Sequence, residues 1–502
     1  EEDAIINIVD SSANWQDLKR RYENSLVEDL SLPAGFTASL REYQTLGYKW
    51  LLRLCCWETG ALLADDMGLG KTIQTLAVLL KKAQNGPSMI ICPTSLIFNW
   101  CREAEKFAPC LNTVIYSESD RTSQSLCLKP FDLLLVSYGL VQRDIERLSR
   151  ADWNILVIDE AQAVKNDEAK TTRAVRQIRA RWKVALSGTP VENNLKELWS
   201  LFRTVCPGLL GSFESFKTKY ILPIERYGNV HSRERLRAVI RPFILRRLKN
   251  ECLSELPEKT YVDAYVDLSP EERAVYDVIR VQAIDKIREN SQKAETSGRA
   301  DSGRFDILAA LTRLRLAACH PGLVLDEGSY SSSKLEYLRE LCQRLKDGGH
   351  KALIFSQFTS FLSLIGDLLD DMEFTYMVLE GGSSTKEREK MVGRFQAGET
   401  DFFLISLKAG GYGLNLTRAD YVIHMDPWWN PAVEDQATDR AYRMGQANKV
   451  TVYRIIGRGT VEETIMKIHD SKRDLATRLL EGTSQASALT REEMLKIMEV
   501  IS

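Results

Sequence analysis

The run Asp65-Asp66-Met67-Gly68-Leu69-Gly70-Lys71-Thr72 constrains the fold of this chain more than any other segment. It follows a short apolar segment, Ala61–Ala64, and precedes a helical pattern of apolar residues from Ile73 to Leu80. A strand that turns through glycines into a helix directs backbone N–H groups and the positive end of the helix dipole at one point, where an anion binds. The segment therefore predicts a phosphate-binding loop between a strand and a helix.

Individual roles follow from this loop. Lys71 is expected to reach the β- and γ-phosphates of a nucleotide, and the Thr72 hydroxyl is expected to hold Mg²⁺. The general pattern has a glycine five residues before Gly70, where this chain has Asp65. A glycine-rich turn with an exposed lysine is the alternative for Gly-Lys-Thr alone, but the flanking strand and helix favour nucleotide binding.

The length and composition of the chain limit its class. A chain of 502 residues is expected to form two or more domains. Its 44% hydrophobic and 27% charged residues are typical of a soluble globular protein. No uninterrupted apolar stretch reaches the ~20 residues of a membrane helix, and the start shows no secretory signal pattern, so we expect an intracellular protein without a membrane partner. Because the sequence begins at Glu1 rather than Met, we expect a longer parent protein.

The net charge does not narrow the choice of partner, whereas the cysteine spacing argues against a zinc site. The net charge of −2 argues neither for nor against a nucleic-acid partner. The 10 cysteines show no Cys-x-x-Cys spacing, so we expect reduced thiols and no zinc site.

Short apolar runs recur in both halves of the chain, with helical patterns between them. Continuous apolar runs of this length indicate buried parallel strands, so the sequence predicts two α/β domains in tandem. In the first half the runs are Ala61–Ala64, Met89–Cys92, Leu133–Val136, Ile155–Ile158 and Val184–Leu186. In the second half they are Ala352–Phe355, Tyr376–Leu379, Phe402–Ile405, Tyr421–Ile423 and Val450–Ile456.

The segment between these halves is predicted to contain amphipathic helices rather than strands, such as Pro270–Arg288 and Phe305–Ala318. Two loops are expected, Asn290–Gly303 and Gly381–Ser384. The predicted divisions are a helical lead-in over residues 1–35, a first α/β domain over 36–205, a helical insert and linker over 206–333, a second α/β domain over 334–470, and a helical tail over 471–502.

Asp159 and Glu160 directly follow the predicted strand Ile155–Ile158. Residues at the carboxyl end of a parallel strand face the ligand crevice of an open α/β sheet. Asp159 is expected to hold Mg²⁺, and Glu160 to orient and deprotonate the water that attacks the γ-phosphate. Alone, the pair also fits an acidic turn in solvent, but its place on a strand downstream of a phosphate loop favours hydrolysis. Ser187-Gly188-Thr189-Pro190 follows the next strand, and we expect it to link hydrolysis to the neighbouring domain.

Arg440 and Arg443 lie in the second half and are three residues apart, so on a helix they would share a face. Two guanidinium groups on one face suit a polyanion. Because the second half has no phosphate loop of its own, we expect these arginines to reach the nucleotide held by the first domain, where such groups contribute ~10³-fold or more in rate. The alternative is a surface helix with local ion pairs.

The order of these motifs resembles the superfamily 2 helicase core and, more narrowly, the SWI/SNF-type ATPases, which translocate along duplex DNA. The resemblance covers about Leu40 to His469. The segments that carry it are Leu40–Gln44, Ala64–Gln74, Leu186–Asn193, Pro242–Arg247, Ser406–Leu416, Asp426–Pro431 and Asp435–Gln446.

The resemblance implies two tandem RecA-like parallel-sheet domains with ATP and Mg²⁺ as cofactors. The implied nucleotide contacts are Gln44, which would read the adenine, and Asp66, Met67, Gly68, Leu69, Gly70, Lys71, Thr72 and Gly413. The implied catalytic residues are Lys71, Glu160, Arg440 and Arg443, and the implied Mg²⁺ ligands are Thr72 and Asp159. Coupling between hydrolysis and movement would involve Gln162, Ser187, Gly188, Thr189 and Gln436.

The resemblance also implies contacts to one DNA strand. These would come from Thr94, Ser95, Ser137, Tyr138, Ser406, Lys408 and Gly410, with Trp428 and Trp429 near the DNA. The insert over residues 206–321 would form the protrusions of the family, and Pro242–Arg247 would belong to it.

Two positions depart from the family pattern. Asp66 stands where the family usually has Glu, and Gln162 stands where it usually has His. Glutamine can still form hydrogen bonds but cannot titrate. Gln162 together with a compact insert favours a bacterial member, and hence the bacterial cytoplasm or nucleoid.

The expected function is that of an ATP-dependent motor with a monomeric core. It would translocate on double-stranded DNA, hydrolyse ATP in the cleft between its two domains, and remodel or displace an unidentified DNA-bound protein. Three alternatives remain open. They are a strand-separating helicase on DNA or RNA, a factor that recycles stalled RNA polymerase, and a degenerate ATPase that serves as a binding module.

Overall fold

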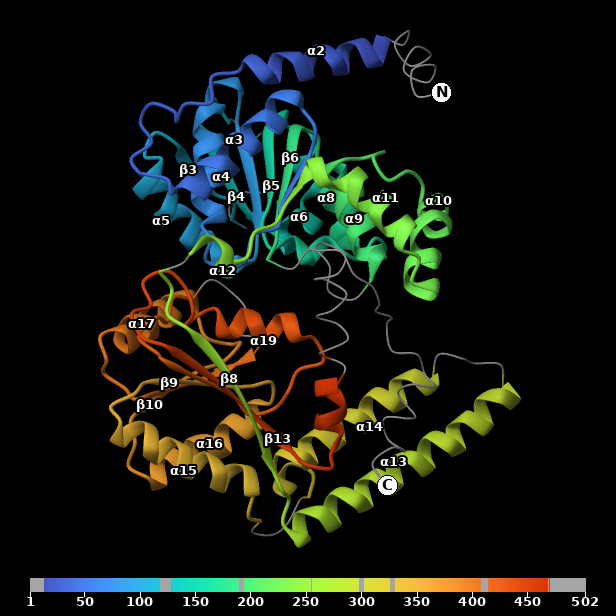
Figure 1. The fold of residues 1–502 in the computed structure, drawn as a ribbon, viewed down its shortest axis with the longest axis vertical. Coiled ribbons are helices and arrows are strands. Elements are labelled where there is room, and N and C mark those ends of the chain that lie inside the picture. Colours follow the sequence, from blue (N-terminus) through green and yellow to red (C-terminus); the bar gives the residue numbers. More distant parts are fainter. Residues whose placement is uncertain are drawn as a thin grey trace. The chain divides into compact units, whose positions relative to one another are not determined.

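Two parallel sheets, one in each half of the chain, organise this computed structural model (Figure 1). The structure describes residues 13–117, 128–188, 194–253, 255–297, 302–325, 330–407, 414–467 and 469. These residues divide into two units, with the boundary in the chain at residue 254. Each unit contains one of the sheets, which is the α/β class that the sequence predicts.

Unit 1 contains a seven-stranded sheet in its described residues, in the order β3-β4-β2-β5-β6-β1-β7. All neighbouring strands pair in parallel. The strands are β1 (Ala61–Leu63), β2 (Ser88–Cys92), β3 (Asn112–Ile115), β4 (Asp132–Ser137), β5 (Trp153–Ile158), β6 (Ala180–Leu186) and β7 (Ile244–Leu245). The five strands predicted in this half are confirmed. The edge strand β3 was not predicted, because its partly exposed residues form no apolar run.

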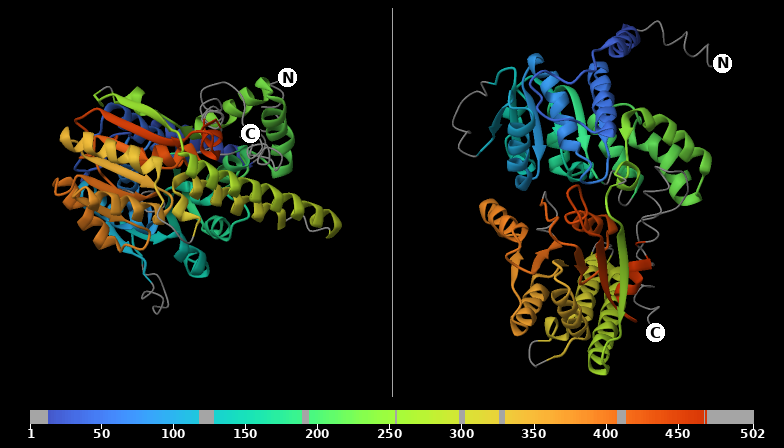
Figure 2. Two further views of the ribbon diagram at one scale, coloured as in Figure 1. Left: turned by 90° about the horizontal axis from the view of Figure 1, so that it is seen from below. Right: turned by 60° about the vertical axis from the view of Figure 1, so that its left-hand side comes forward.

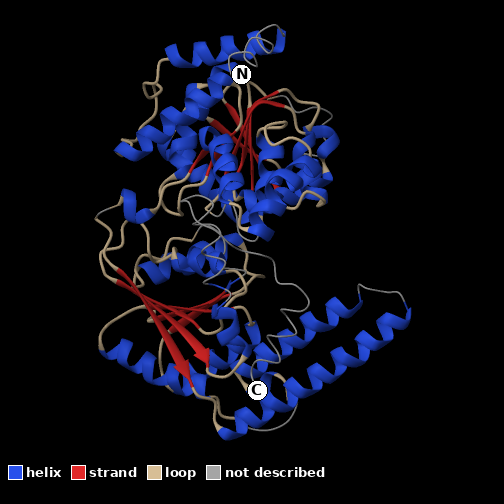
Figure 3. Ribbon diagram, turned by 45° about the vertical axis from the view of Figure 1, so that its right-hand side comes forward, coloured by secondary structure: helices blue, strands red, loops and turns tan. Residues whose placement is uncertain are grey.

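Helices cover both faces of this sheet (Figure 3). Alternate strand residues such as Leu63, Ile90 and Val157 form one core with α3, α4 and α5. Helices α6 and α9 contribute no residue to this core but also contact strands of the sheet. The helices are α2 (Ala13–Val27), α3 (Glu42–Trp57), α4 (Lys71–Lys81), α5 (Ile97–Phe107), α6 (Tyr138–Arg143), α7 (Ile145–Leu148), α8 (Lys170–Gln177), α9 (Leu195–Val205), α10 (Phe213–Phe216), α11 (Val230–Ile240) and α12 (Lys249–Cys252). Shorter or irregular turns are η2 (Thr94–Leu96), η4 (Ala161–Val164) and the π-helix η5 (Lys217–Arg226).

Unit 2 contains a six-stranded parallel sheet in its described residues, in the order β10-β11-β9-β12-β13-β8. The strands are β8 (Lys259–Val266), β9 (Ala352–Ser356), β10 (Tyr376–Leu379), β11 (Phe402–Ser406), β12 (Tyr421–His424) and β13 (Val450–Gly457). Helices α15 (Ser333–Asp347) and α16 (Thr359–Asp371) share a core with one face, and α17 (Thr385–Gln396) and α19 (Pro431–Thr438) with the other. The five strands predicted in this half are confirmed.

Two strands lie inside the segment that was predicted to be helical. β7 pairs with β1 in unit 1, and β8 pairs with β13 in unit 2. The prediction of helices without strands over residues 206–333 is therefore wrong at these two places. Both strands lie at a sheet edge, where β7 has only two residues and β8 is largely exposed, so neither carries the continuous apolar run of a central strand.

Helices α13 (Pro270–Ser297) and α14 (Ser302–Cys319) form a hairpin that projects from unit 2 (Figure 2). Tyr276 and Leu311 belong to the core that joins them, and this core also includes Val461. The predicted loop Asn290–Gly303 is wrong over most of its length, because α13 continues to Ser297. Residues 292–295 read Gln-Lys-Ala-Glu, which are strong helix formers despite their polarity.

The remaining expectations concern the ends and one loop. The predicted lead-in is helical over Ala13–Val27, and Gly381–Ser384 forms a turn, as expected. The tail over residues 471–502 lies outside the described residues. Within the described part of the chain, no helix combines the length and the apolar character needed to cross a membrane.

Candidate nucleotide site

Three neighbouring strands of unit 1 bring the predicted motifs to one edge of the sheet. In the order β5-β6-β1, Asp159–Glu160 follows β5, Ser187–Gly188 follows β6, and the loop Asp65–Gly70 follows β1. Because these strands are parallel, their carboxyl ends meet at the same edge, where open α/β sheets bind ligands. The cradle, between residues 65 and 70, thus forms one site with motifs that follow residues 158 and 186 of the chain.

The loop after β1 has the backbone conformation of a phosphate cradle. Gly68 and Gly70 have φ angles of +85° and +78°, which glycine adopts without strain, and α4 begins at Lys71. The Lys71 ammonium donates to the carbonyl oxygens of Asp65 at 2.7 Å and Asp66 at 3.3 Å. Its charge is therefore held within the loop, beside the N-terminus of α4.

Asp159 is a buried carboxylate that accepts two hydrogen bonds. Trp100 Nε1 donates to its Oδ2 at 2.8 Å, and the backbone N–H of Glu160 donates to its Oδ1 at 2.9 Å. Burial, together with the neighbouring Glu160 charge, raises the pKa of Asp159 to about 7, although these hydrogen bonds and Lys71 act in the opposite direction. A divalent cation would favour the charged form. The Thr72 hydroxyl and this carboxylate are hard oxygen donors, so the residues fit Mg²⁺.

Glu160 has an unusual backbone conformation. Its φ angle is +49°, in the left-handed region, which costs a residue with a Cβ roughly 1–2 kcal/mol. Strain of this kind clusters at functional sites, where surrounding structure holds it. The Glu160 side chain accepts a hydrogen bond from Gln162 Nε2 at 2.7 Å.

Gln162 and Ser187 connect the acidic pair to the next strand. The Ser187 hydroxyl donates to Gln162 Oε1 at 3.4 Å, and the Ser187 N–H donates to the Leu63 carbonyl at 3.1 Å. A Cβ added to Gly188 would lie 3.0 Å from Met67 Cγ in the cradle loop. The turn after β6 therefore lies between the acidic pair and the cradle. Thr189 lies outside the described residues.

Gln44 joins the start of α3 to the cradle. Its side chain is buried, and its Nε2 donates to the Leu69 carbonyl and to the Tyr43 hydroxyl, both at 3.3 Å. A Cβ on Gly70 would lie 2.5 Å from the same nitrogen, so a glycine is required by close approach as well as by its φ angle.

The predicted DNA contacts of unit 1 lie at the carboxyl ends of β2 and β4. Thr94 and Ser95 lie in η2, and Thr94 is exposed. The Ser137 hydroxyl caps α6 by accepting from the Leu140 N–H at 3.4 Å. The Tyr138 hydroxyl donates to the Asp159 carbonyl at 2.6 Å, so this residue is bonded to the backbone of the acidic pair.

Pro242–Arg247 was expected to belong to the helical insert, and this expectation is wrong. Leu62 and Leu63 of β1 pair with Ile244 and Leu245, which makes the segment the edge strand of the first sheet. The Arg247 side chain bonds to the buried Asp65 carboxylate, with Nε at 2.9 Å from Oδ1 and one terminal nitrogen at 2.5 Å from Oδ2. Asp65, the misfit to the general phosphate-loop pattern, is thus an ion-pair partner.

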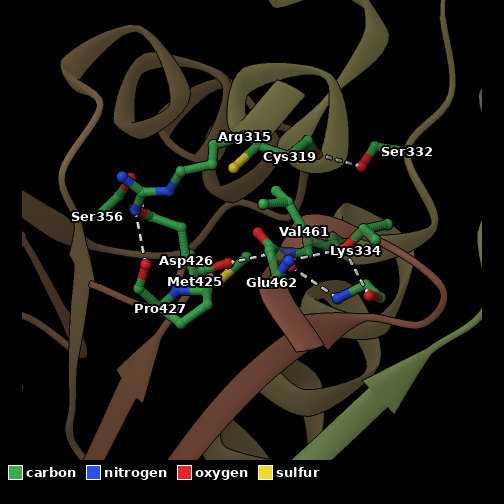
Figure 4. A network of polar contacts seen from close by, with 12 residues as sticks. Arg315, Cys319, Ser332, Lys334, Ser356, Met425, Asp426, Pro427, Val461 and Glu462 are labelled. Atoms are coloured by element: carbon green, nitrogen blue, oxygen red, sulfur yellow. Dashed lines mark hydrogen bonds and ion pairs between the residues drawn. The ribbon is translucent and has the colours of Figure 1, made fainter. Parts of the chain in front are cut away.

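In unit 2, the two predicted tryptophans belong to a turn that follows β12 and is built on a buried polar network (Figure 4). The Asp426 carboxylate accepts from the Ser356 hydroxyl at 2.5 Å and from the Gln357 N–H at 3.2 Å. Arg315 of α14 donates to the Pro427 carbonyl at 2.6 Å and lies 3.5 Å from Asp426 Oδ2.

The same arginine lies against the tryptophans. Its guanidinium carbon is 5.9 Å from the ring centre of Trp428 and 5.6 Å from that of Trp429, within the range of cation–π attraction. Beside it, the fully buried Lys334 ammonium lies 2.7 Å from Glu462 Oε2 and donates to the Met425 carbonyl at 2.9 Å (Figure 4). The hairpin, α15 and the chain after β13 therefore all hold this turn.

Arg440 and Arg443 do not share a helix face, so that part of the prediction is wrong. Helix α19 ends at Thr438, and both arginines lie in the turns that follow. The Gln446 amide donates to the carbonyls of Thr417, Ala419 and Ala441, which ties these turns to the segment before β12. Arg440 is buried, whereas Arg443 is partly exposed and donates to the Leu414 carbonyl at 3.3 Å.

The other predicted residues of unit 2 are distributed as follows. Ser406 ends β11 and is buried, and Gln436 lies on α19. Lys408, Gly410 and Gly413 lie outside the described residues.

Comparison with known families matches the SNF2-related domain to residues 43–323, more than half of the chain. This chain belongs to the SNF2-related family. The helicase conserved C-terminal domain matches residues 333–445, as expected for a superfamily 2 ATPase. Both the family resemblance and the fold of two tandem RecA-like domains are confirmed.

Relatives in the SNF2-related family come from bacteria, archaea and eukaryotes. YwqA of Bacillus subtilis is named as an ATP-dependent helicase/translocase. It is 40% identical to this chain over a stretch that covers 92% of this chain and 51% of YwqA. The TATA-binding protein-associated factor mot1 of Schizosaccharomyces pombe is 33% identical over 92% of this chain and 27% of its own length. The solved SWI2/SNF2 ATPase core of Sulfolobus solfataricus, in complex with double-stranded DNA, is 35% identical, with 92% of this chain and 100% of that chain covered and a TM-score of 0.46.

The chain spans about half the length of the bacterial relatives it matches. The SNF2-related core is therefore the part of those proteins to which this structure corresponds.

Three contacts of this SNF2-related site were not predicted from the sequence. Trp100 holds Asp159, Arg247 holds Asp65, and Arg315 holds the tryptophan turn. Trp100 is a single aromatic residue on an amphipathic helix, where a role in the core is the ordinary reading. Arg247 carried a signal, its place in the motif Pro242–Arg247, but that motif was assigned to the insert.

Proposed function

We propose that this chain is the motor core of an ATPase that translocates on double-stranded DNA and remodels or displaces a protein bound there. The observation that carries the proposal is the meeting of a phosphate cradle and the strained Glu160 at one edge of the sheet, at the carboxyl ends of β1 and β5, the two strands that flank β6. The name of YwqA as a helicase/translocase supports a motor. The name of mot1, which associates with the TATA-binding protein, supports a bound protein as the object of its work.

In this proposal the residues of unit 1 bind and hydrolyse ATP. The cradle N–H groups and Lys71 bind the phosphates, and Gln44 reads the adenine. Glu160 takes the proton of the attacking water, with Gln162 holding its carboxylate at 2.7 Å. Mg²⁺, held by Thr72 and Asp159, would supply positive charge to the phosphates. We assign the neutralisation of transition-state charge to Arg440 and Arg443 of unit 2, because guanidinium groups suit a polyanion.

DNA binding is proposed to use the sugar-phosphate backbone. Thr94 and Ser95 follow β2, the strand next to β5, and Ser137 ends β4, the strand after that. Tyr138 bonds to the Asp159 carbonyl, which supports a link between DNA contact and the hydrolysis site. Phosphate contacts carry no base sequence, so they suit a motor that must bind every step of its track. We further propose that the protein acts as a monomer and that it lies inside a bacterial cell. The bacterial source is supported by relatives from Bacillus subtilis and Mycoplasma pneumoniae that are 40% and 36% identical, against 33% for mot1.

The decisive test is the rate of ATP hydrolysis with duplex DNA, with single-stranded DNA, with RNA and without nucleic acid. We expect the duplex to give the greatest stimulation. A preference for RNA, or sustained separation of strands on a forked duplex, would favour a strand-separating helicase instead. Lys71→Ala is the control that should abolish hydrolysis, and a wild-type chain that binds ATP without turnover would identify a binding module.

A further inference from the structure

Residues shortly before the unit boundary at residue 254 are hydrogen-bonded to the cradle loop. The Ala64 N–H donates to the Leu245 carbonyl at 2.7 Å, and the Asp66 N–H donates to the Arg247 carbonyl at 3.0 Å. The Lys249 N–H donates to Asp66 Oδ2 at 3.1 Å. The backbone that follows β1 is therefore fixed to a segment about 180 residues later, a few positions before the unit boundary.

The Arg247 side chain joins three elements at once. Besides the two bonds to Asp65, a terminal nitrogen donates to Gln74 Oε1 at 2.9 Å, and the other terminal nitrogen donates to the Tyr43 carbonyl. The guanidinium also lies 5.3 Å from the Tyr43 ring centre. The Asp65 side chain is 0% exposed and that of Arg247 only 13%, so solvent screens this pair weakly. A planar fork with five donors can make these bonds together, whereas a lysine cannot.

The contacts continue from Gln74 to the cradle. Gln74 Nε2 donates to the Gly70 carbonyl at 3.0 Å and to the Leu69 carbonyl at 3.4 Å. The Leu69 carbonyl is also the acceptor of Gln44 Nε2. Helix α3 comes so close here that a Cβ on Gly47 would lie 1.9 Å from Gln74 Oε1 and 2.7 Å from an Arg247 nitrogen. This close packing restricts the movement of both side chains.

We propose that Arg247 is a positioning residue for nucleotide binding, an inference that rests on the proposed ATPase function. Through Asp65 it holds the start of the cradle loop, and through Gln74 it holds the end of the loop beside Gln44. Its bond to the Tyr43 carbonyl holds the start of α3 against both. The distance between the cradle and the adenine-reading Gln44 is thereby fixed before ATP binds. Preorganisation of this kind lowers the free-energy cost of binding.

The test is Arg247→Lys, which keeps the charge but loses the fork. We expect the KM for ATP to rise about tenfold or more, since small misplacements of binding groups have effects of this size. The kcat should change much less, because Lys71, Asp159 and Glu160 are untouched. The preference for ATP over GTP should also fall, because Gln44 loses its fixed position. The matched control is Arg241→Lys, an exposed arginine six residues earlier, which should leave both constants unchanged.

A second variant distinguishes positioning from general support of the fold. Asp65→Asn keeps the size of the side chain but removes its charge. If Arg247 acts through Asp65, the double variant should raise the KM no more than the worse single variant does. The proposal would be overturned if the increases in KM of the two single variants multiplied in the double variant. It would also be overturned if Arg247→Lys had a normal KM, or if its loss of activity were confined to kcat. If thermal unfolding shows that Arg247→Lys does not fold, the test uses Asp65→Asn alone. A normal KM in that variant would likewise overturn the proposal. A wild-type chain without ATP binding or hydrolysis would instead contradict the proposed function.

Discussion

At the scale of single residues, the site contains two buried carboxylates, one bonded to neutral donors and the other paired with a positive charge. Asp159 is buried with neutral donors and without an arginine or lysine bonded to it in the described structure, and burial raises its pKa. Asp65 is also buried but is paired with the Arg247 guanidinium. The first carboxylate suits a cation that arrives with the substrate, and the second suits a fixed structural role. Glu160 differs from both, because its strained backbone and its bond to Gln162 fix where its carboxylate lies.

Glu160→Gln should separate binding from hydrolysis. Loss of the base is expected to reduce the rate of ATP hydrolysis about 10²- to 10⁴-fold, while the dissociation constant for ATP stays near that of the wild type. Hydrolysis and equilibrium nucleotide binding would be measured on the same preparation. Glu168→Gln, in an exposed turn, is the matched control and should hydrolyse ATP normally. Near-normal hydrolysis in Glu160→Gln would remove Glu160 from the mechanism.

At the scale of elements, prediction succeeded where the pattern was continuous and local. β2 and β5 are buried at every position, so their apolar runs were sufficient to identify them. β7 and β8 are defined by partners elsewhere in the chain, β1 and β13, and short or exposed edge strands carry no such pattern. The cradle and the acidic pair were predictable because each motif follows its own strand. Trp100, Arg247 and Arg315 act through tertiary contacts and were not predictable from spacing.

The contact of α14 with the tryptophan turn should matter for DNA rather than for ATP. Arg315→Met keeps much of the side-chain volume but leaves Asp426 without its arginine, and breaking a buried pair costs roughly 3–5 kcal/mol of stability. We expect the stimulation of ATPase rate by duplex DNA to fall several-fold while the rate without DNA changes little.

The comparison requires a folded variant, so thermal unfolding would accompany the ATPase rates. Arg313→Met, an exposed arginine on the same helix, is the control and should retain full stimulation. Unchanged stimulation in a folded Arg315→Met would show that the position of the tryptophan turn does not affect the response to DNA.

Asp401 should give unit 2 a pH-dependent stability. Burial of its carboxylate raises the pKa, but hydrogen bonds from Lys346, Lys351 and Thr375 outweigh this effect and lower the pKa from 3.8 to about 2. The stabilisation is therefore complete above pH 3.8 and is lost as the pH falls towards 2, with a total of about 2 kcal/mol.

Asp401→Asn tests whether this stabilisation is lost as the pH falls. The difference in unfolding free energy between wild type and variant should be about 2 kcal/mol at pH 7 and should shrink as the pH falls from 4 to 2. Denaturant unfolding at several pH values measures it. A difference that stays constant over this range would show that the carboxylate charge is not the source of the stabilisation.

At the scale of the whole molecule, the division of the chain follows the sheets rather than the apparent helical insert. β7 completes the first sheet and β8 begins the second, with the unit boundary at residue 254 between them. The predicted boundaries at residues 205 and 333 would leave each sheet without an edge strand. They would also separate the buried Asp65 from Arg247.

Two fragments of the first half should therefore differ in stability. A fragment that ends at residue 253 keeps β7 and the Arg247 bonds, whereas one that ends at residue 205 exposes the edge of β1 and leaves Asp65 buried without its partner. We expect the longer fragment to unfold cooperatively, and the shorter one to be less stable by several kcal/mol. Thermal unfolding followed by circular dichroism compares them. Equal stability would show that the segment from residue 206 to residue 253 is dispensable for the first sheet.

The pairing of β8 with β13 also has a consequence for synthesis on the ribosome. The first sheet has all of its described strands once Leu245 has been made, but Lys259 pairs with Val450. At ~5–20 residues per second, β8 therefore waits roughly 10–40 s for a partner about 190 residues later in the chain. An unpaired strand is a template for wrong pairing, and β8 exposes Tyr261 and Tyr265. Slowed translation within the second half should thus reduce the yield of folded protein, while the first half is already complete.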